Sequence, residues 1–174
     1  YDGLYGVSQN KKEAAKNFKI AADKGNDEGM VNYAKMLYTG DGINKNEKEA
    51  IKYFKMASDN GNVESMYALA QILYKNDSVP GNLKEAAVLF KKLADENNHC
   101  ESMYLFGVMN FLGEGIPVNK KEAYKYIKMA ANHGHVKAMN KYAELITSGK
   151  DFPTDHKEGI KYYKMGADKG DTDA

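Results

Sequence analysis

The chain has 174 residues, of which 43% are hydrophobic and 28% are charged, a composition typical of a globular protein that can bury a core. Its 25 basic and 24 acidic residues leave a net charge of +1, which argues against nucleic acid or an anionic membrane as the main partner. No apolar stretch approaches the roughly 20 residues that a membrane span needs, so we expect no direct membrane insertion. Cys100 is the single cysteine, which excludes an intrachain disulfide. The single cysteine and the absence of a visible signal sequence slightly favour a cytoplasmic location.

A short motif recurs along the whole chain and predicts five repeats. It consists of Lys-Glu followed by two small or apolar residues, and successive copies lie 36, 36, 37 and 36 residues apart. The copies begin at Lys12, Lys48, Lys84, Lys121 and Lys157. Self-similarity at such a period indicates stacked supersecondary units, each of which buries its faces against its neighbours.

In chain order, we expect a partial repeat at 1–25 that holds only its second helix, and then four complete repeats. These span 26–61, 62–98, 99–134 and 135–170, and residues 171–174 begin a further repeat. Because the chain starts and stops out of register with its repeats, we expect it to be a fragment of a longer, continuous array.

The first helix of each complete repeat, helix A, is predicted from four segments that align without gaps. They are Met30–Thr39, Met66–Lys75, Met103–Leu112 and Met139–Ser148. Each has a small residue at the same place, which lets the helix approach its neighbour closely: Ala34, Ala70, Gly107 and Ala143. Asn110 replaces a residue that is usually apolar, so we expect a buried amide or a local rearrangement there. Glycine or proline turns follow at 40–43, 78–80, 113–117 and 151–153.

The second helix, helix B, carries an N-terminal signal in every repeat. An Asn or Asp stands three residues before a glutamate in all five copies: Asn10, Asn46, Asn82, Asn119 and Asp155. This spacing predicts a capping box, in which the first side chain accepts from the glutamate's N–H and the glutamate reaches back to the cap N–H. Capping explains every copy, so we do not interpret the acidic row as catalytic. Left-handed residues are predicted to end these helices: Gly25, Gly61, Asn98, Gly134 and Gly170.

Together the small residue of helix A, the Gly-x-Gly turn, the Lys-Glu-Ala start and the Ala-Ala…Gly end resemble the Sel-one-like repeat family, which is related to tetratricopeptide repeats. The resemblance implies an all-α fold, a right-handed αα-superhelix (solenoid) of antiparallel helix pairs with about nine helices. It also implies an adaptor that assembles signalling, membrane-associated or protein-degradation complexes. Some secreted bacterial relatives carry a cysteine pair in every repeat and have been suggested to be hydrolases. The single Cys100 does not fit that branch.

By analogy with tetratricopeptide arrays, helices A line a concave surface. The side chains expected to face it and to bind a partner peptide or helix are Val31, Lys35, Tyr38, Tyr67, Gln71, Tyr74, Tyr104, Val108, Phe111, Asn140 and Glu144. We place the centre of this groove at repeats three and four, where aromatic residues suited to protein interfaces gather. The alternative is that these aromatics pack as core between helices A. Nearly complete burial of Tyr67, Tyr74 and Tyr104 would favour that alternative.

No motif predicts an enzyme. The chain lacks a phosphate-binding loop, a His-Glu-x-x-His site and a Gly-x-Ser-x-Gly elbow, so we expect no catalytic residue, cofactor or metal. His133 and His135 flank a predicted helix end, where a histidine meets the negative end of the helix dipole. The lysines of helix B, such as Lys52 and Lys125, are expected to form a solvated outer face. A protein-binding scaffold is therefore the favoured function. The alternative is a structural array that self-associates end to end through apolar faces near Tyr1 and Leu4.

Overall fold

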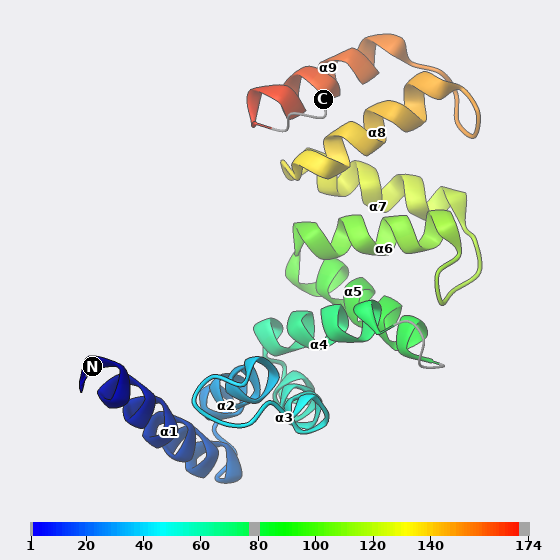
Figure 1. The fold of residues 1–174 in the computed structure, drawn as a ribbon. Coiled ribbons are helices and arrows are strands. Elements are labelled where there is room, and N and C mark those ends of the chain that lie inside the picture. The colour runs from blue at the N-terminus through cyan, green and yellow to red at the C-terminus, as the bar shows by residue number, and fades with distance from the viewer. Residues whose placement is uncertain (1, 77–80, 171–174) are drawn as a thin grey trace. The chain divides into compact units, whose positions relative to one another are not determined.

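The computed structural model describes the backbone of residues 2–76 and 81–170, and the side chains of these ranges from residue 10 onward. Nine α-helices and no strand occur within them (Figure 1). The helices are α1 (Asp2–Asp23), α2 (Asp27–Thr39), α3 (Glu47–Asp59), α4 (Val63–Lys75), α5 (Asn82–Asn97), α6 (Cys100–Leu112), α7 (Lys120–Asn132), α8 (Val136–Ser148) and α9 (His156–Asp168). The predicted all-α class and helix number are confirmed. The predicted turn at 78–80 and the start of a repeat at 171–174 lie outside the described residues.

The chain divides into two compact units, and each is described by itself. The first unit comprises Tyr1–Lys75 and holds α1 to α4, and the second comprises Asn76–Ala174 and holds α5 to α9. Inside each unit, helices that follow one another in the chain pack together in pairs, such as α2 with α3 and α6 with α7. The small residues predicted for helix A are buried at these contacts; Ala34 and Ala143 are examples from the two units.

Side chains cap three of the B helices as predicted. The N–H groups of Glu49, Glu122 and Glu158 donate to the side-chain oxygens of Asn46, Asn119 and Asp155 at 3.2, 3.1 and 2.9 Å. The reciprocal half of the predicted capping box is wrong. The backbone N–H of each cap residue donates instead to a carbonyl of helix A in the same repeat, namely to Leu37 at 2.8 Å, Asn110 at 2.9 Å and Ile146 at 2.8 Å. Each cap therefore also closes the hairpin between helices A and B.

Two predicted caps are absent. Asn10 lies inside α1, which runs without a break from Asp2, so the helix expected to start at residue 11 is longer. Asn82 is the first residue of α5, and Gly81 occupies the cap position without a side-chain hydrogen bond. The amide of Asn82 donates to the carbonyl of Asn76 at 2.9 Å, which explains why that side chain does not turn back onto its own helix. Asn110 is a buried amide, as expected, and donates to the carbonyl of Phe106 at 2.8 Å.

A tyrosine of helix B links successive repeats at three places. The ring of this residue meets an aromatic ring of helix A edge to face, with centroids 5.0 Å apart for Tyr33–Tyr53, 4.8 Å for Phe106–Tyr126 and 4.8 Å for Tyr142–Tyr162. Its hydroxyl donates to the end of the preceding helix B, from Tyr53 to Asp23 at 2.9 Å, from Tyr126 to Asp95 at 2.6 Å and from Tyr162 to Asn132 at 2.5 Å. One side chain thus connects the two helices of its own repeat and the repeat before it.

The second glycine of the A-to-B turn allows the turn to lie directly on the preceding helix B. Gly42 has a φ of +75°, and a Cβ placed there would lie 2.6 Å from Cβ of Lys11 and 2.9 Å from its carbonyl carbon. Gly115 has a φ of +71° and stands equally close to Leu83. Both the backbone conformation and the close backbone neighbour therefore require glycine.

We predict that Gly42→Ala destabilises the first unit by about 3 kcal/mol, since the left-handed conformation costs about 1 kcal/mol and the clash with Lys11 costs about 2 kcal/mol more. Gly61→Ala is the matched control, because Gly61 has a φ of +90° with no atom within 4 Å of the added Cβ. Chemical unfolding followed by circular dichroism measures both. Equal losses in the two variants would contradict the close approach of the turn.

A second prediction concerns the hydroxyl of Tyr126. Burial opposes ionisation of Asp95, but hydrogen bonds from Lys91 and Tyr126 outweigh it and lower the pKa of this carboxyl from 3.8. A depressed pKa contributes stability that is complete above the unfolded-state value and is lost as the pH falls through the folded-state value. Tyr126→Phe should therefore cost about 1 kcal/mol near neutral pH, with the difference from the parent shrinking below about pH 4.

Tyr162→Phe is the control for this experiment, because its hydroxyl binds the amide of Asn132, which does not titrate. Its loss of stability should be similar in size and constant across the same acid range. Denaturant unfolding at several pH values provides the comparison. A Tyr126→Phe difference that stays constant down to pH 3 would show that Asp95 is not held by this hydroxyl.

Candidate functional site

A groove between α2 and α4 is lined by residues of several helices of the first unit. Its volume is about 190 Å³. Its walls come from both A helices and its base from α3, and its lining residues are Lys35, Tyr38, Thr39, Phe54, Ala68, Gln71, Ile72 and Lys75. Phe54 is only 2% exposed and Ile72 is also buried, so the base is apolar and fixed by the core of the unit. Three of the residues predicted from the sequence to face a groove, Lys35, Tyr38 and Gln71, meet here.

The rim of this groove is polar and carries positive charge. Nζ of Lys35 lies 2.6 Å from Oε1 of Glu64, so an ion pair joins α2 to α4 beside the groove. Gln71 donates from Nε2 to the hydroxyl of Tyr67 at 2.8 Å, which holds both side chains along α4. Nζ of Lys45 lies 5.5 Å from the ring centroid of Tyr38, a cation–π distance. On the α2 side, the groove is therefore lined by the ring of Tyr38, and the ammonium group of Lys45 lies over one face of this ring.

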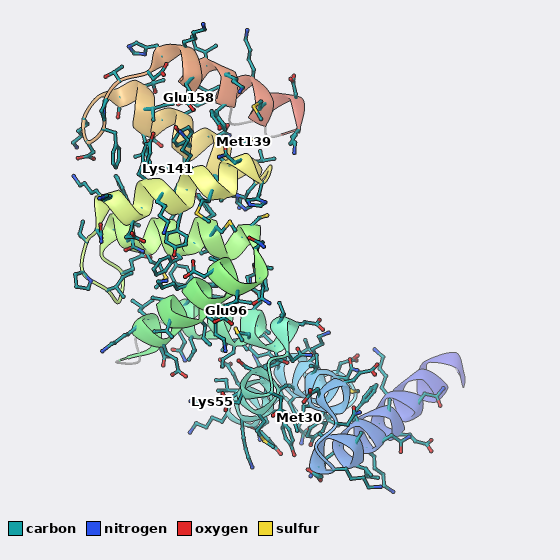
Figure 2. All side chains as sticks on the ribbon, turned by 180° about the vertical axis from the view of Figure 1, so that it is seen from behind. Met30, Lys55, Glu96, Met139, Lys141 and Glu158 are labelled. Atoms are coloured by element: carbon teal, nitrogen blue, oxygen red, sulfur yellow. The ribbon has the colours of Figure 1, made fainter. Side chains whose placement is uncertain are left out.

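The same positions in the second unit form a different surface. The alignment of the A helices places Lys141 of α8 (labelled in Figure 2) at the position of Ala68. Its ammonium lies 5.3 Å from the ring centroid of Phe111 on α6 and 2.9 Å from Oε2 of Glu144. The lysine side chain therefore crosses from α8 to α6. In the first unit the methyl group of Ala68 leaves that space open.

The predicted aromatic residues are neither buried core nor fully exposed. Tyr38, Tyr67, Tyr74, Tyr104 and Phe111 are all half-buried, which leaves a face of each accessible. Val31 differs, since it is 4% exposed, belongs to the core and is not among the residues that line the groove between α2 and α4. Tyr67 and Tyr74 belong to the first unit and Tyr104 and Phe111 to the second. The groove expected to be centred on repeats three and four therefore stays a prediction.

Histidines cap two of the A helices, a role that the sequence pattern did not predict. His135 caps α8, with its Nδ1 accepting from the N–H of Ala138 at 3.1 Å. Its Nε2 lies 2.5 Å from Oε2 of Glu101, and its ring stacks on Tyr104 with centroids 4.9 Å apart. His135 thus does not serve as a partner for the C-terminal dipole of α7. Because Nδ1 accepts from the backbone, Nε2 carries the proton and donates to the carboxylate.

The signal for these caps was present in the repeat alignment. The residues that precede helix A occupy one position of the repeat and all have a side-chain acceptor: Asn26, Asn62, His99 and His135. Burial lowers the pKa of His99, the largest effect on this group, which favours the neutral ring that its capping role needs. Burial also raises the pKa of Tyr104, with Glu101 adding to the effect, so this hydroxyl stays protonated at neutral pH.

A larger hollow of about 540 Å³ lies along α9. Its described lining residues all come from α9 and its cap, and they are Asp155, Lys157, Glu158, Ile160, Lys161, Lys164, Met165 and Asp168. No second described helix contributes a lining residue that would fix the position of an occupant. The groove between α2 and α4 is therefore the better-defined candidate site, although it is smaller.

Among the described residues, His, Cys, Asp and Glu side chains form no group of three with the geometry of a metal site. The thiol of Cys100 lies 3.7 Å from the carbonyl oxygen of Asn98, beside the start of α6. None of the helices described here is long and apolar enough to cross a membrane.

Pairs of helices that recur with a fixed period, with caps at equivalent positions, define an α-helical repeat protein. The Sel1 repeat model matches residues 1–26, 27–62, 63–98, 100–135 and 136–171, and the chain belongs to this family. The resemblance drawn from the sequence is thereby confirmed. Sel1 repeat proteins commonly act as protein-interaction scaffolds, and their fold is typically not that of an enzyme.

Solved structures of this class are similar to the chain. A Sel1 repeat protein from Oxalobacter formigenes has a TM-score of 0.84 and 23% identity, over 94% of this chain and 67% of that one. A protective antigen of uropathogenic Escherichia coli strains that displays an SLR fold has a TM-score of 0.82 and 22% identity, over 90% of this chain and 33% of that one. The chain thus spans a third of the antigen, and these likenesses establish the fold alone. No curated protein matches the chain.

We predict that His135→Ala destabilises the second unit by about 1 kcal/mol, because the first turn of α8 loses its cap. His135→Asn keeps a short side-chain acceptor and should recover most of this loss, although the contacts with Glu101 and Tyr104 disappear. Thermal unfolding of the three proteins tests the assignment. If the asparagine variant were as unstable as the alanine variant, stacking on Tyr104 and not capping would be the main role of His135.

Proposed function

We propose that this chain is a protein-interaction scaffold that binds a peptide or helix of a partner along its A helices, with the groove between α2 and α4 as a docking point. The observation that carries the proposal is the shape and composition of this groove. Three helices of one unit build it, its base is apolar through Phe54 and Ile72, and its rim carries Tyr38, Lys35 and Gln71. An apolar centre within a polar rim is the usual anatomy of a protein interface.

The size of the groove argues for a side chain as its occupant. A volume of about 190 Å³ is smaller than the roughly 300–1,000 Å³ typical of small-molecule and cofactor sites. It suits one apolar side chain of a partner, whose backbone would lie across the rim. Aromatic anchors in such positions contribute strongly to interfaces, because they bury a large area with little loss of side-chain freedom.

The proposal is tested by closing the groove. Ala68 is half-buried at its wall, and the chain itself carries Leu105 and Lys141 at the equivalent position. Peptides should be selected from a random 12-residue phage library on the intact chain, and then measured against Ala68→Leu and Ala68→Lys by fluorescence polarisation. We expect both variants to weaken binding about tenfold or more, because a larger side chain occupies the space of the anchor.

Met56→Lys is the matched control, since Met56 is partly exposed on α3 and does not line the groove. It should bind the peptides like the parent. Circular dichroism and thermal unfolding verify that all variants keep their helices. Selected peptides that bind Ala68→Leu and the parent equally, or a library that yields no binder, would overturn the groove as the docking point.

A further inference from the structure

The groove between α2 and α4 is asymmetric in charge. Lysines stand on both of its walls, Lys35 on α2 and Lys75 on α4, and none of the described residues that line it is acidic. Lys75 has no carboxylate partner among the residues that the structure describes. Lys35 is paired with Glu64, whose side chain is 61% exposed and lies outside the lining of the groove. The nearby Lys45 lies over the ring of Tyr38, and its ammonium is also 3.9 Å from Oε2 of Glu47, which lies outside the lining of the groove.

This charge is a property of the first unit and not of the repeat. At the positions of Lys35 and Lys75, the second unit has Val108 and Ser148. The second unit carries one lysine there, Lys141, whose ammonium lies 2.9 Å from Glu144 and 5.3 Å from the ring centroid of Phe111. Its side chain fills the space that Ala68 leaves open in the first unit. Packing of the helix pairs therefore does not require lysine at these places. Two lysines opposite each other across an apolar base form a surface that complements negative charge.

We infer that the groove between α2 and α4 recognises an acidic segment of a partner protein, in which an apolar side chain enters above Phe54 and flanking Asp or Glu side chains meet Lys35 and Lys75. The inference rests on the proposed function, because it names the chemistry of the peptide that the groove would take. Ammonium groups on the rim attract carboxylates before contact and discriminate against basic segments. The apolar base supplies the burial that holds the segment.

Glu64 provides a direct test, because its carboxylate would compete with a carboxylate of the partner for Lys35. A partner carboxylate would have to share Lys35 with Glu64 at 2.6 Å or displace it. Removal of the Glu64 charge should therefore strengthen the binding of an acidic peptide. If the Lys35–Glu64 pair merely held α2 and α4 together, the same substitution would weaken binding. The sign of the change separates recognition from a structural role.

The experiment uses the peptides selected on the intact chain, synthesised with amidated C-termini so that side chains are their sole carboxylates. We expect the sequences lost on Ala68→Leu to be enriched in Asp and Glu around an apolar residue. Replacement of those acids by Asn and Gln should weaken binding about tenfold, and so should Lys35→Gln/Lys75→Gln, whereas Glu64→Gln should strengthen it several-fold. Affinity should fall as salt rises from about 50 to 500 mM.

The outcomes separate this inference from the proposed function. Peptides that are lost on Ala68→Leu but show no acidic enrichment, or that tolerate Lys35→Gln/Lys75→Gln, would leave the groove as a docking point and overturn its acidic specificity. Weaker binding by Glu64→Gln would also overturn it, as would binding that needs a free C-terminal carboxylate. Binding that is indifferent to Ala68→Leu would remove the proposed function itself, and this inference with it.

Discussion

The stacking of this protein depends on a tyrosine that performs two tasks at once. In Tyr53, Tyr126 and Tyr162 the ring packs edge to face on helix A of its own repeat, and the hydroxyl donates to the end of the preceding helix B. A ring contact of this kind is worth about 0.5–1.5 kcal/mol beyond its buried area. The hydroxyl adds direction, because a hydrogen bond weakens steeply as its angle departs from linear and so limits the rotation of a repeat on its neighbour.

The third repeat has no tyrosine at this position of helix B. Leu89 and Phe90 occupy the corresponding part of α5, and neither can donate a hydrogen bond. The boundary between the two compact units, after Lys75, falls inside this same repeat. The extra residue of the third repeat belongs to this helix too, which has 16 residues where α3 and α7 have 13. The repeat that departs from the periodic pattern is thus the one in which the chain divides.

The period of the sequence was enough to predict the helices, because caps and turns are local and recur in every copy. Local rules failed where a tertiary contact competed with them. The backbone N–H of Asn46 donates to Leu37 of helix A in the same repeat and not to Glu49. Asn10 is not a cap for another reason, because α1 runs through it without a break. The histidine caps were missed because capping statistics favour Asn, Asp, Ser and Thr, although an unprotonated ring nitrogen accepts the same hydrogen bond.

The candidate groove was predicted in part, for a similar reason. Helical spacing identified the inward side of helix A, and Lys35, Tyr38 and Gln71 do line the groove. Helical spacing in the sequence could not show how deeply each of these side chains is buried. Val31 is buried although Tyr67 and Tyr104 at the same position are half-buried, because the short side chain ends within the core whereas the longer ones extend past it. Nor did it point to Ala68, whose small size opens the groove.

Comparison among the repeats separates what packing demands from what it leaves open. The methionine at the fourth position of each A helix is buried in every complete repeat, at 3% exposure or less. Met30 and Met139, one from each unit, are labelled in Figure 2. Five positions further along, the side chain is Lys35, Gln71, Val108 or Glu144 in turn. Stacking tolerates a positive, a neutral, an apolar and a negative group there. Packing therefore does not determine the charge at this position, and a single framework can present side chains of different charge along one chain.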